Sequence, residues 1–250
     1  MPAALRRVYG SDLRLDAPVL YANFVTSVDG VAAVESVPSS GSLLSGDSPG
    51  DRFLMGLLRA LADAVLVGAG TLRATPGHRW TAQHIFPPLA GEFSRLRRRL
   101  GRAPDPLLVV LTSSGDLDPS HPALQSDALV ITTQDGARRA SGRLPGTCKV
   151  RSMSRGKRVD LARAVAVLRT EGYGAILSEA GPLVMGQLVR QELVDDLFLT
   201  LSPVLAGRRR GDGNKSLVEG VHLLPDKPAW MNLVDVRRQG SHLFLRYQRA

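Results

Sequence analysis

The chain has 250 residues, of which 44% are hydrophobic and 22% charged, a composition typical of globular proteins with a sizeable core. Cys148 is its single cysteine, which excludes an internal disulfide, and no window holds the roughly 20 apolar residues that span a bilayer. The first residues contain no apolar run of the kind found in signal peptides. These features predict a cytoplasmic protein without a membrane segment.

The basic charge raises the question of nucleic acid. Lysines and arginines number 32 against 23 acids, a net charge of +9, with the densest runs at residues 95–102 and 208–210. Such runs are usually solvated surface, which is our prediction for both. Only 5% of the residues are aromatic, and no helix-turn-helix, zinc-finger or RNA-recognition pattern accompanies the arginines. A phosphorylated substrate or cofactor suits the charge equally, so nucleic acid is not the expected partner.

The first half of the chain alternates strand and helix. Residues 19–26, rich in β-branched and aromatic types, predict a central strand that ends at a turn around Asp29-Gly30. A loop rich in glycine and serine follows over residues 36–48. Ser48 as N-cap and Pro49 at the first helical position open a helix whose apolar stripe runs to Leu61. A short buried strand over 64–67 comes next.

The second half continues the alternation and then closes with strands. Residues 73–106 contain five prolines and predict an irregular excursion with one short amphipathic helix around 91–100. Further strands are expected over residues 107–112, 128–132, 148–151, 175–178 and 194–202, helices over 159–170 and 182–190, and a terminal hairpin over 229–238 and 242–247. This order predicts one α/β domain over residues 1–250, with 1–18 as an N-terminal extension. Its sheet should be mostly parallel, with helices on both faces and an antiparallel hairpin at the C-terminal end.

Ligands of open α/β sheets bind outside the carboxyl ends of the strands, often at helix N-termini. Asp29 follows the first strand and can face a nicotinamide and its substrate, although an aspartate in such a turn also commonly bonds its own backbone. Gly68 and Gly70 let backbone approach a ligand, and Thr71 can donate to a phosphate. The segment is not a Rossmann fingerprint, because Arg73 stands where a third glycine is required, so a plain tight turn is the alternative.

Glu179 gives the sharpest indication of a site. It ends the strand over 175–178, and Gly181-Pro182 then opens a helix with free amides. A carboxylate in that position can accept hydrogen bonds from a ring amide. Other chemistries are excluded: a single cysteine cannot build a deaminase zinc site, and the five histidines show no metal-binding spacing, so no metal is expected.

Four segments in this order resemble the reductase domain of the riboflavin-pathway pyrimidine deaminase–reductases and the stand-alone reductases of that family. They are residues 22–30, 51–71, 176–183 and 195–207. The likeness spans residues 20–207 and includes no deaminase domain. It implies a dihydrofolate-reductase-like fold, NADPH as cofactor, a homodimer, and hydride transfer to C1′ of a ring-opened ribosylaminopyrimidine.

The resemblance also implies which residues form the site. Thr26 and Thr71 resemble cofactor contacts, and residues 181–187 resemble a pyrophosphate-binding helix start (Gly181, Pro182, Leu183, Val184, Met185, Gly186 and Gln187). Arg59 resembles a residue that meets the substrate phosphate and Glu179 one that meets the pyrimidine. Ser45 is expected near the substrate, Asp29 and Glu179 are the catalytic candidates, and Ser113 or a nearby arginine is expected to meet a 2′-phosphate.

Several departures from the family pattern keep the substrate open. Ala180 replaces the first glycine of E-G-G-P, residues 74–76 replace a D-D-P, and residues 43–45 lack a polar and aromatic pair. The leading prediction is reduction of 5-amino-6-(5-phosphoribosylamino)uracil or the related diaminopyrimidinone. The second is reduction of dihydrofolate or another pterin, and the third is a non-catalytic protein that binds nucleotides or nucleic acid.

Overall fold

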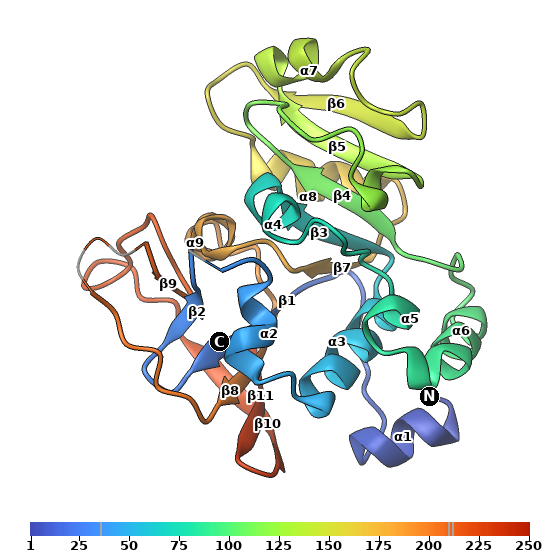
Figure 1. Cartoon of the computed structure of the whole chain (residues 1–250), viewed down its shortest axis with the longest axis vertical. Coiled ribbons are helices and arrows are strands. Elements are labelled where there is room, and N and C mark those ends of the chain that lie inside the picture. The colour runs from blue at the N-terminus through green and yellow to red at the C-terminus, as the bar shows by residue number, and fades with distance from the viewer. Residues whose placement is uncertain (36, 210, 212) are drawn as a thin grey trace.

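A computed structural model describes residues 1–35, 37–209, 211 and 213–250 (Figure 1). The helices are α1 (Ala3–Tyr9), α2 (Ser40–Ser45), α3 (Pro49–Leu61), α4 (Ala69–Ala74), α5 (Ala82–Ile85), α6 (Ala90–Arg99), α7 (Gln134–Ala140), α8 (Leu161–Thr170) and α9 (Pro182–Arg190). The strands are β1 (Val19–Ser27), β2 (Val31–Ala33), β3 (Ala64–Gly68), β4 (Leu107–Leu111), β5 (Ala128–Thr133), β6 (Cys148–Ser154), β7 (Ala175–Ser178), β8 (Asp196–Ser202), β9 (Lys215–Ser216), β10 (Met231–Gln239) and β11 (His242–Arg249).

One large sheet organises the described part of the chain, in the strand order β10-β11-β8-β1-β7-β3-β4-β5-β6. All neighbours from β8 to β6 pair in parallel. The terminal hairpin β10–β11 joins antiparallel through the pairing of β11 with β8. The predicted α/β fold, with a mostly parallel sheet and a C-terminal antiparallel hairpin, is confirmed.

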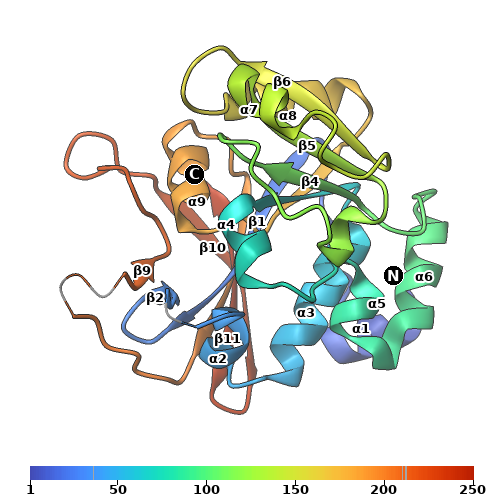
Figure 2. The ribbon, with the colours of Figure 1, turned by 45° about the horizontal axis from the view of Figure 1, so that its top comes forward.

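Helices cover both faces of the sheet. One core cluster joins α1, α3 and α6 to inward residues such as Tyr21 and Phe198, and the other joins α8 and α9 to Ala22 and Leu197. Figures 1 and 2 show α1, α3, α5 and α6 gathered together, away from α8 and α9. Successive residues of β1 point to opposite faces of the sheet. The register between the strands therefore shows which side chains lie on the face that α3 covers.

The N-terminal extension is part of this packing. It forms α1, whose Leu5 is fully buried and whose Tyr9 is 9% exposed. The Tyr9 hydroxyl donates to Asp235 on β10 at 3.2 Å, and the Arg237 guanidinium lies 4.0 Å from the centre of the tyrosine ring. Residues before β1 thus fasten the hairpin to the α3 side of the sheet.

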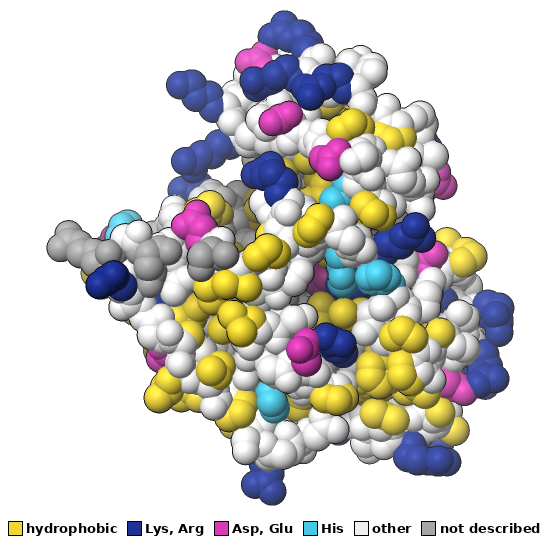
Figure 3. Space-filling model, in the orientation of Figure 1, with side chains coloured by type: hydrophobic (Ala, Val, Ile, Leu, Met, Phe, Trp, Pro, Cys, Tyr) yellow, Lys and Arg dark blue, Asp and Glu magenta, His cyan; other side chains and the backbone are white. Residues whose placement is uncertain are grey.

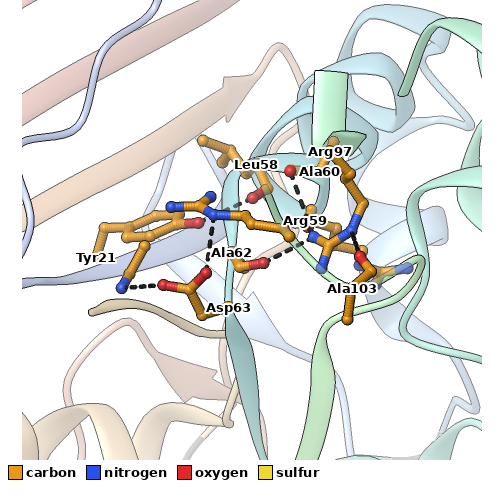
Figure 4. A network of polar contacts seen from close by, with 10 residues as sticks. Tyr21, Leu58, Arg59, Ala60, Ala62, Asp63, Arg97 and Ala103 are labelled. Atoms are coloured by element: carbon orange, nitrogen blue, oxygen red, sulfur yellow. Dashed lines mark hydrogen bonds and ion pairs between the residues drawn. The ribbon is translucent and has the colours of Figure 1, made fainter. Parts of the chain in front are cut away.

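The basic run at 95–102 is not all solvated, which corrects the sequence prediction. Arg97 is 2% exposed, and its guanidinium donates to the carbonyls of Ala62 at 2.7 Å, Arg59 at 3.1 Å, Ala60 at 3.3 Å and Ala103 at 2.7 Å. Figure 4 shows Arg97 directed at these carbonyls. The last carbonyls of a helix have no partner within it, so α6 supplies Arg97 to the end of α3. Arg102 pairs with Asp63 at 2.8 Å.

Other arginines do lie on the surface. Arg98, Arg99, Arg208 and Arg209 are exposed, whereas Arg210 of the second run lies outside the described residues. Figure 3 shows Lys and Arg side chains scattered over this face and its margin rather than gathered into one patch. No described helix is long and apolar enough to cross a membrane. The structure also contains, within the residues it describes, no cluster of three or more potential metal ligands.

Several short helices were not predicted. Residues 36–48 hold α2, the turn after β3 continues as α4, residues 73–106 hold α5 as well as α6, and α7 follows β5. These segments are rich in glycine, serine, threonine or arginine and lack an apolar stripe of helical period. Tertiary contacts rather than local pattern stabilise helices of this length.

Candidate functional site

An ion pair at the carboxyl edge of the sheet is the centre of the candidate site. Glu179 follows β7 directly, and its amide donates to the Leu66 carbonyl of β3 at 2.9 Å. Both of its carboxylate oxygens accept from Arg59 on α3, Oε1 from Nε at 3.0 Å and Oε2 from Nη2 at 2.6 Å. The side chains are 8% and 1% exposed. Two parallel hydrogen bonds fix the plane of the carboxylate, and each oxygen keeps a second lone pair for another donor.

The same pair occupies most of the Arg59 guanidinium. Its Nη1 points at the carbonyls of Arg79 and Thr81, each at 3.4 Å. The Arg59 side chain is only 1% exposed in this structure. Contact of Arg59 with a substrate phosphate therefore stays a prediction, and the contacts present here are those with Glu179 and the two carbonyls.

Histidines from three separate segments gather near this pair: His78 after α4, His84 in α5 and His121 between β4 and β5. The His78 ring lies 4.9 Å from both Trp80 and His84, measured between ring centres, and His121 Nε2 contacts the Thr75 carbonyl at 3.1 Å. Burial, together with the nearby Arg59 charge, lowers the pKa of His78 to about 3, so this ring is neutral at neutral pH. Figure 3 shows histidine side chains beside an acidic one near the middle of the face. This cluster cannot be recognised from the sequence, because its histidines come from separate segments of the chain and do not have metal-binding spacing.

The two predicted cofactor segments meet above the sheet. A Cβ built on Gly181 would lie 3.5 Å from Thr71 Oγ1, and one on Gly68 would lie 3.7 Å from a Val184 methyl. A Cβ on Gly70 would have no described atom within 4 Å. The start of α9 and the turn after β3 therefore present open backbone side by side. This arrangement fits a pyrophosphate, because amides and the helix dipole both favour negative charge there.

Residues 181–187 do not all face this opening. Met185 is 1% exposed and belongs to the core beneath the helix. A Cβ on Gly186 would lie 2.2 Å from the Glu219 carbonyl, so the long loop after β8 packs against this side of α9. The Pro182 carbonyl accepts from the Glu219 amide at 3.2 Å. Met185 and Gly186 are therefore enclosed in this structure, whereas Leu183 is exposed and Gly181, Val184 and Gln187 are half-buried.

Asp29 holds a loop rather than pointing at Glu179. Its carboxylate accepts from the Ser27 hydroxyl, from the Ala206 amide at 3.0 Å and from the Gly207 amide at 2.7 Å. The Ser27 hydrogen bond, followed by that of the Ala206 amide, lowers the pKa of this exposed carboxyl to about 2. These contacts join the end of β1 to the loop after β8, and a catalytic role of Asp29 stays a prediction.

The remaining predicted positions differ in access. Ser113 is exposed just beyond β4, where its carbonyl accepts from Thr133 Oγ1 at 2.9 Å. Thr26 is 4% exposed on β1. Ser45 is 1% exposed, its hydroxyl donates to the Ser42 carbonyl at 3.2 Å, and its own carbonyl contacts His242. Ser113 is open to a ligand, whereas Ser45 is enclosed by α2 and the hairpin.

Three polar residues that sequence reasoning did not single out lie on the α3 face. Asn23 and Thr200 are 8% and 0% exposed, on β1 and β8. Asp51, at the start of α3, is 4% exposed, and burial raises its pKa to about 6 against the lowering effect of the neighbouring Thr200 hydroxyl. Asn23 and Thr200 each follow apolar residues of a strand, and Asp51 stands in the first turn of a helix, so the sequence did not mark them as site residues.

A hollow of about 320 Å³ lies elsewhere, between α1, α3 and the hairpin. Its apolar lining includes Phe53, Phe198 and Phe244. Two of the arginines around it are already paired, Arg237 with Asp235 and Arg246 with Asp196, each at 2.7 Å. It does not include Glu179 or the start of α9, so it is not the candidate site.

Known proteins share this architecture. A crystal structure of a pyrimidine reductase-like protein from Corynebacterium diphtheriae superposes with a TM-score of 0.76 at 25% identity, covering 100% of this chain and 99% of that one. Acinetobacter baumannii RibD gives 0.69 at 18% identity over 94% of this chain and 58% of its own, a likeness of fold. The 2,5-diamino-6-ribosylamino-4(3H)-pyrimidinone 5′-phosphate reductase of Archaeoglobus fulgidus is 26% identical over 200 residues, 77% of this chain and 83% of its own.

The resemblance identified from four sequence segments agrees with these relatives. The model of the RibD C-terminal domain family matches residues 18–241, which include the whole parallel sheet and both halves of the candidate site. The chain belongs to the RibD C-terminal domain family.

Proposed function

We propose that this protein is an NADPH-dependent reductase of a ribosylaminopyrimidine 5′-phosphate in riboflavin biosynthesis. Family membership supports a reductase of this pathway. The observation that carries the proposal is the Arg59–Glu179 pair, a nearly buried carboxylate of fixed orientation two residues before Gly181 at the start of α9. This places an acceptor for pyrimidine N–H groups next to open backbone suited to a pyrophosphate.

Different residues of the site would bind the cofactor and the substrate. Gly181, Leu183 and Thr71 would hold the cofactor pyrophosphate, and Glu179 would accept from the ring nitrogen or an amino group of the substrate. When bound, NADPH supplies the hydride that reduces C1′ of the ring-opened ribosylamine to a ribitylamine. Because Arg59 locks the carboxylate plane, Glu179 orients the pyrimidine without reorganising, and orientation of this kind lowers a reaction barrier.

The function is tested by following NADPH oxidation with each candidate substrate. We expect turnover with 5-amino-6-(5-phosphoribosylamino)uracil or the diaminopyrimidinone, and none with dihydrofolate. Turnover of dihydrofolate alone would make the protein a pterin reductase. Binding of single-stranded DNA that falls steeply as salt rises, with no NADPH oxidation, would favour the nucleic-acid alternative.

The cofactor preference is a separate prediction. We expect NADPH to bind at least about tenfold more tightly than NADH, because the chain is basic and has no acid placed to hold a ribose 2′-hydroxyl in the Rossmann manner. The exposed Ser113 marks the edge at which the 2′-phosphate is expected. Fluorescence titration of both cofactors measures the ratio, and equal affinities would contradict the prediction.

We also propose a homodimer, because the terminal hairpin leaves large apolar side chains uncovered. Trp230 just before β10 is 74% exposed, and Leu233, Val234 and Val236 are 51%, 46% and 52% exposed. Leu233 and Val234 are adjacent, so exposed apolar side chains lie on both faces of β10. Such exposed apolar groups are typical of an association surface. Sedimentation at micromolar concentration is expected to show a dimer, and the double variant L233K/V234K a monomer. A wild-type monomer would contradict the proposal.

A further inference from the structure

Two polar atoms buried on the α3 face, Asn23 Oδ1 and Thr200 Oγ1, form no hydrogen bond of normal geometry with any described residue. The Thr200 hydroxyl nevertheless has the Asp51 carboxyl beside it. Asn23 is 8% exposed and Thr200 fully buried. Polar groups buried in native proteins are nearly always paired, and an exception often marks a functional position. Of the two residues, only Asn23 has any exposed surface, and that surface lies outside its buried Oδ1.

The sheet register places Asn23 beside Glu179. β1 and β7 pair in parallel, with Ala22 opposite Ser178, so the next residues of the two segments, Asn23 and Glu179, lie side by side. Neighbouring strands are about 4.8 Å apart, and paired residues point to the same face. Asn23 shares its face with Tyr21, whose hydroxyl donates to Leu58 of α3 at 2.9 Å. Asn23 and Glu179 thus both lie under α3, at the same edge of the sheet.

Further polar groups extend this edge toward β8. On β8, Phe198 is the partner of Asn23 and Thr200 is the partner of Val25. Thr200 therefore lies on the strand next to Asn23, two residues closer to the carboxyl end. The Asp51 carboxyl lies beside Thr200 and within electrostatic reach of Glu179. An otherwise apolar face therefore carries a strip of polar groups just beyond the end of β7, at the middle of β1 and near the end of β8. An apolar packing role for Asn23 does not account for this strip.

We propose that Asn23 contacts the substrate ring, its carboxamide pairing with the lactam edge of the pyrimidine. A carboxamide has one acceptor and two donor hydrogens, which complement a ring N–H next to a C=O. Glu179, acceptor only when ionised, takes ring and amino N–H groups on the neighbouring edge. Both candidate pyrimidines present a lactam edge. The inference rests on the proposed function, and it adds a specificity residue from β1 to the acceptor on β7.

The test uses Asn23→Leu, a change of similar volume without polar atoms, in the full chain. Calorimetry with NADP⁺ present measures the affinity for the pyrimidine and needs no turnover. We expect a loss of about 5- to 150-fold, the cost of one buried hydrogen-bonding group, with NADP⁺ affinity unchanged. Thermal stability should be equal or higher, because a buried polar group kept for function is replaced by an apolar one. Asn23→Ala, which cannot overpack the site, should weaken pyrimidine binding similarly.

Ser178→Ala is the matched control. Ser178 is also fully buried, its hydroxyl lacks a partner among the described residues, and it precedes Glu179 but pairs with Ala22 on the opposite face. We expect this variant to bind the pyrimidine as wild type does. Pyrimidine affinity within twofold of wild type in both Asn23 variants would overturn the inference. Normal binding by wild type without NADPH oxidation would overturn the proposed reaction alone, since the affinity ratio would still report on Asn23.

Discussion

Replacing Glu179 by glutamine is expected to lower turnover of the pyrimidine about 5- to 150-fold while leaving NADPH affinity nearly unchanged. Glutamine keeps the shape but turns one acceptor into a donor, which then meets a donor on the ring. The cofactor contacts lie beyond Glu179, at Gly181 and Thr71. Steady-state kinetics and cofactor titration separate the two effects.

The same change should also lower the free energy of unfolding by about 3 kcal/mol, because the Arg59 charge, 1% exposed, loses its counter-charge. The double variant Arg59→Met/Glu179→Gln leaves no unpaired charge and should regain most of this stability without regaining turnover. A Glu179→Gln protein with normal kinetics and a lower melting temperature would assign Glu179 a purely structural role. Loss of turnover in proportion to lost NADPH occupancy would place it in the cofactor site.

Arg97→Ala is expected to lower the free energy of unfolding by about 3 kcal/mol without any contact to substrate. The guanidinium donates to four carbonyls, three of them at the end of α3, and is 2% exposed. A hydrogen bond from a charged donor contributes about 1.5–3 kcal/mol, and stranded buried carbonyls add to the loss. Urea denaturation measures the change.

Arg98→Ala serves as its control, since Arg98 is the next residue of the same basic run and is exposed. A surface substitution of this kind usually changes the unfolding free energy by less than about 0.5 kcal/mol. If Arg97→Ala were equally mild, the carbonyls at the end of α3 would have to be satisfied by solvent. The difference in unfolding free energy between the two variants measures the effect of burying Arg97.

Much of the framework follows from local pattern. The helix over 182–190 and the strand over 175–178 have the predicted bounds, because Gly-Pro opens the one and a run of apolar residues defines the other. Ser48 caps α3 as expected, accepting from the Asp51 amide at 3.4 Å. Short helices such as α2 and α7 have no comparable pattern, because contacts with segments distant in the sequence stabilise them.

The sequence indicates Glu179 as a site candidate but does not show which side chain pairs with it. Glu179 was recognisable because a carboxylate at a strand end before Gly-Pro has few structural explanations. The resemblance assigned Arg59 to a phosphate, and nothing in the sequence places it across from Glu179. Asn23 and Thr200 were missed because a single polar residue in an apolar strand looks the same whether it faces a ligand or not. Only the register between strands separates these cases.

The position of β1 has a consequence for how the chain is made. This strand is almost completely buried, yet its two neighbours, β7 and β8, come from residues 175–202. During synthesis, both hydrogen-bonding edges of the apolar β1 therefore remain unpaired until most of the protein has been translated. Pairing between such distant segments makes folding slow, and open apolar edges favour aggregation meanwhile. Asn23 lies on β1 and Glu179 directly follows β7, so the substrate side of the site forms only when these two strands pair.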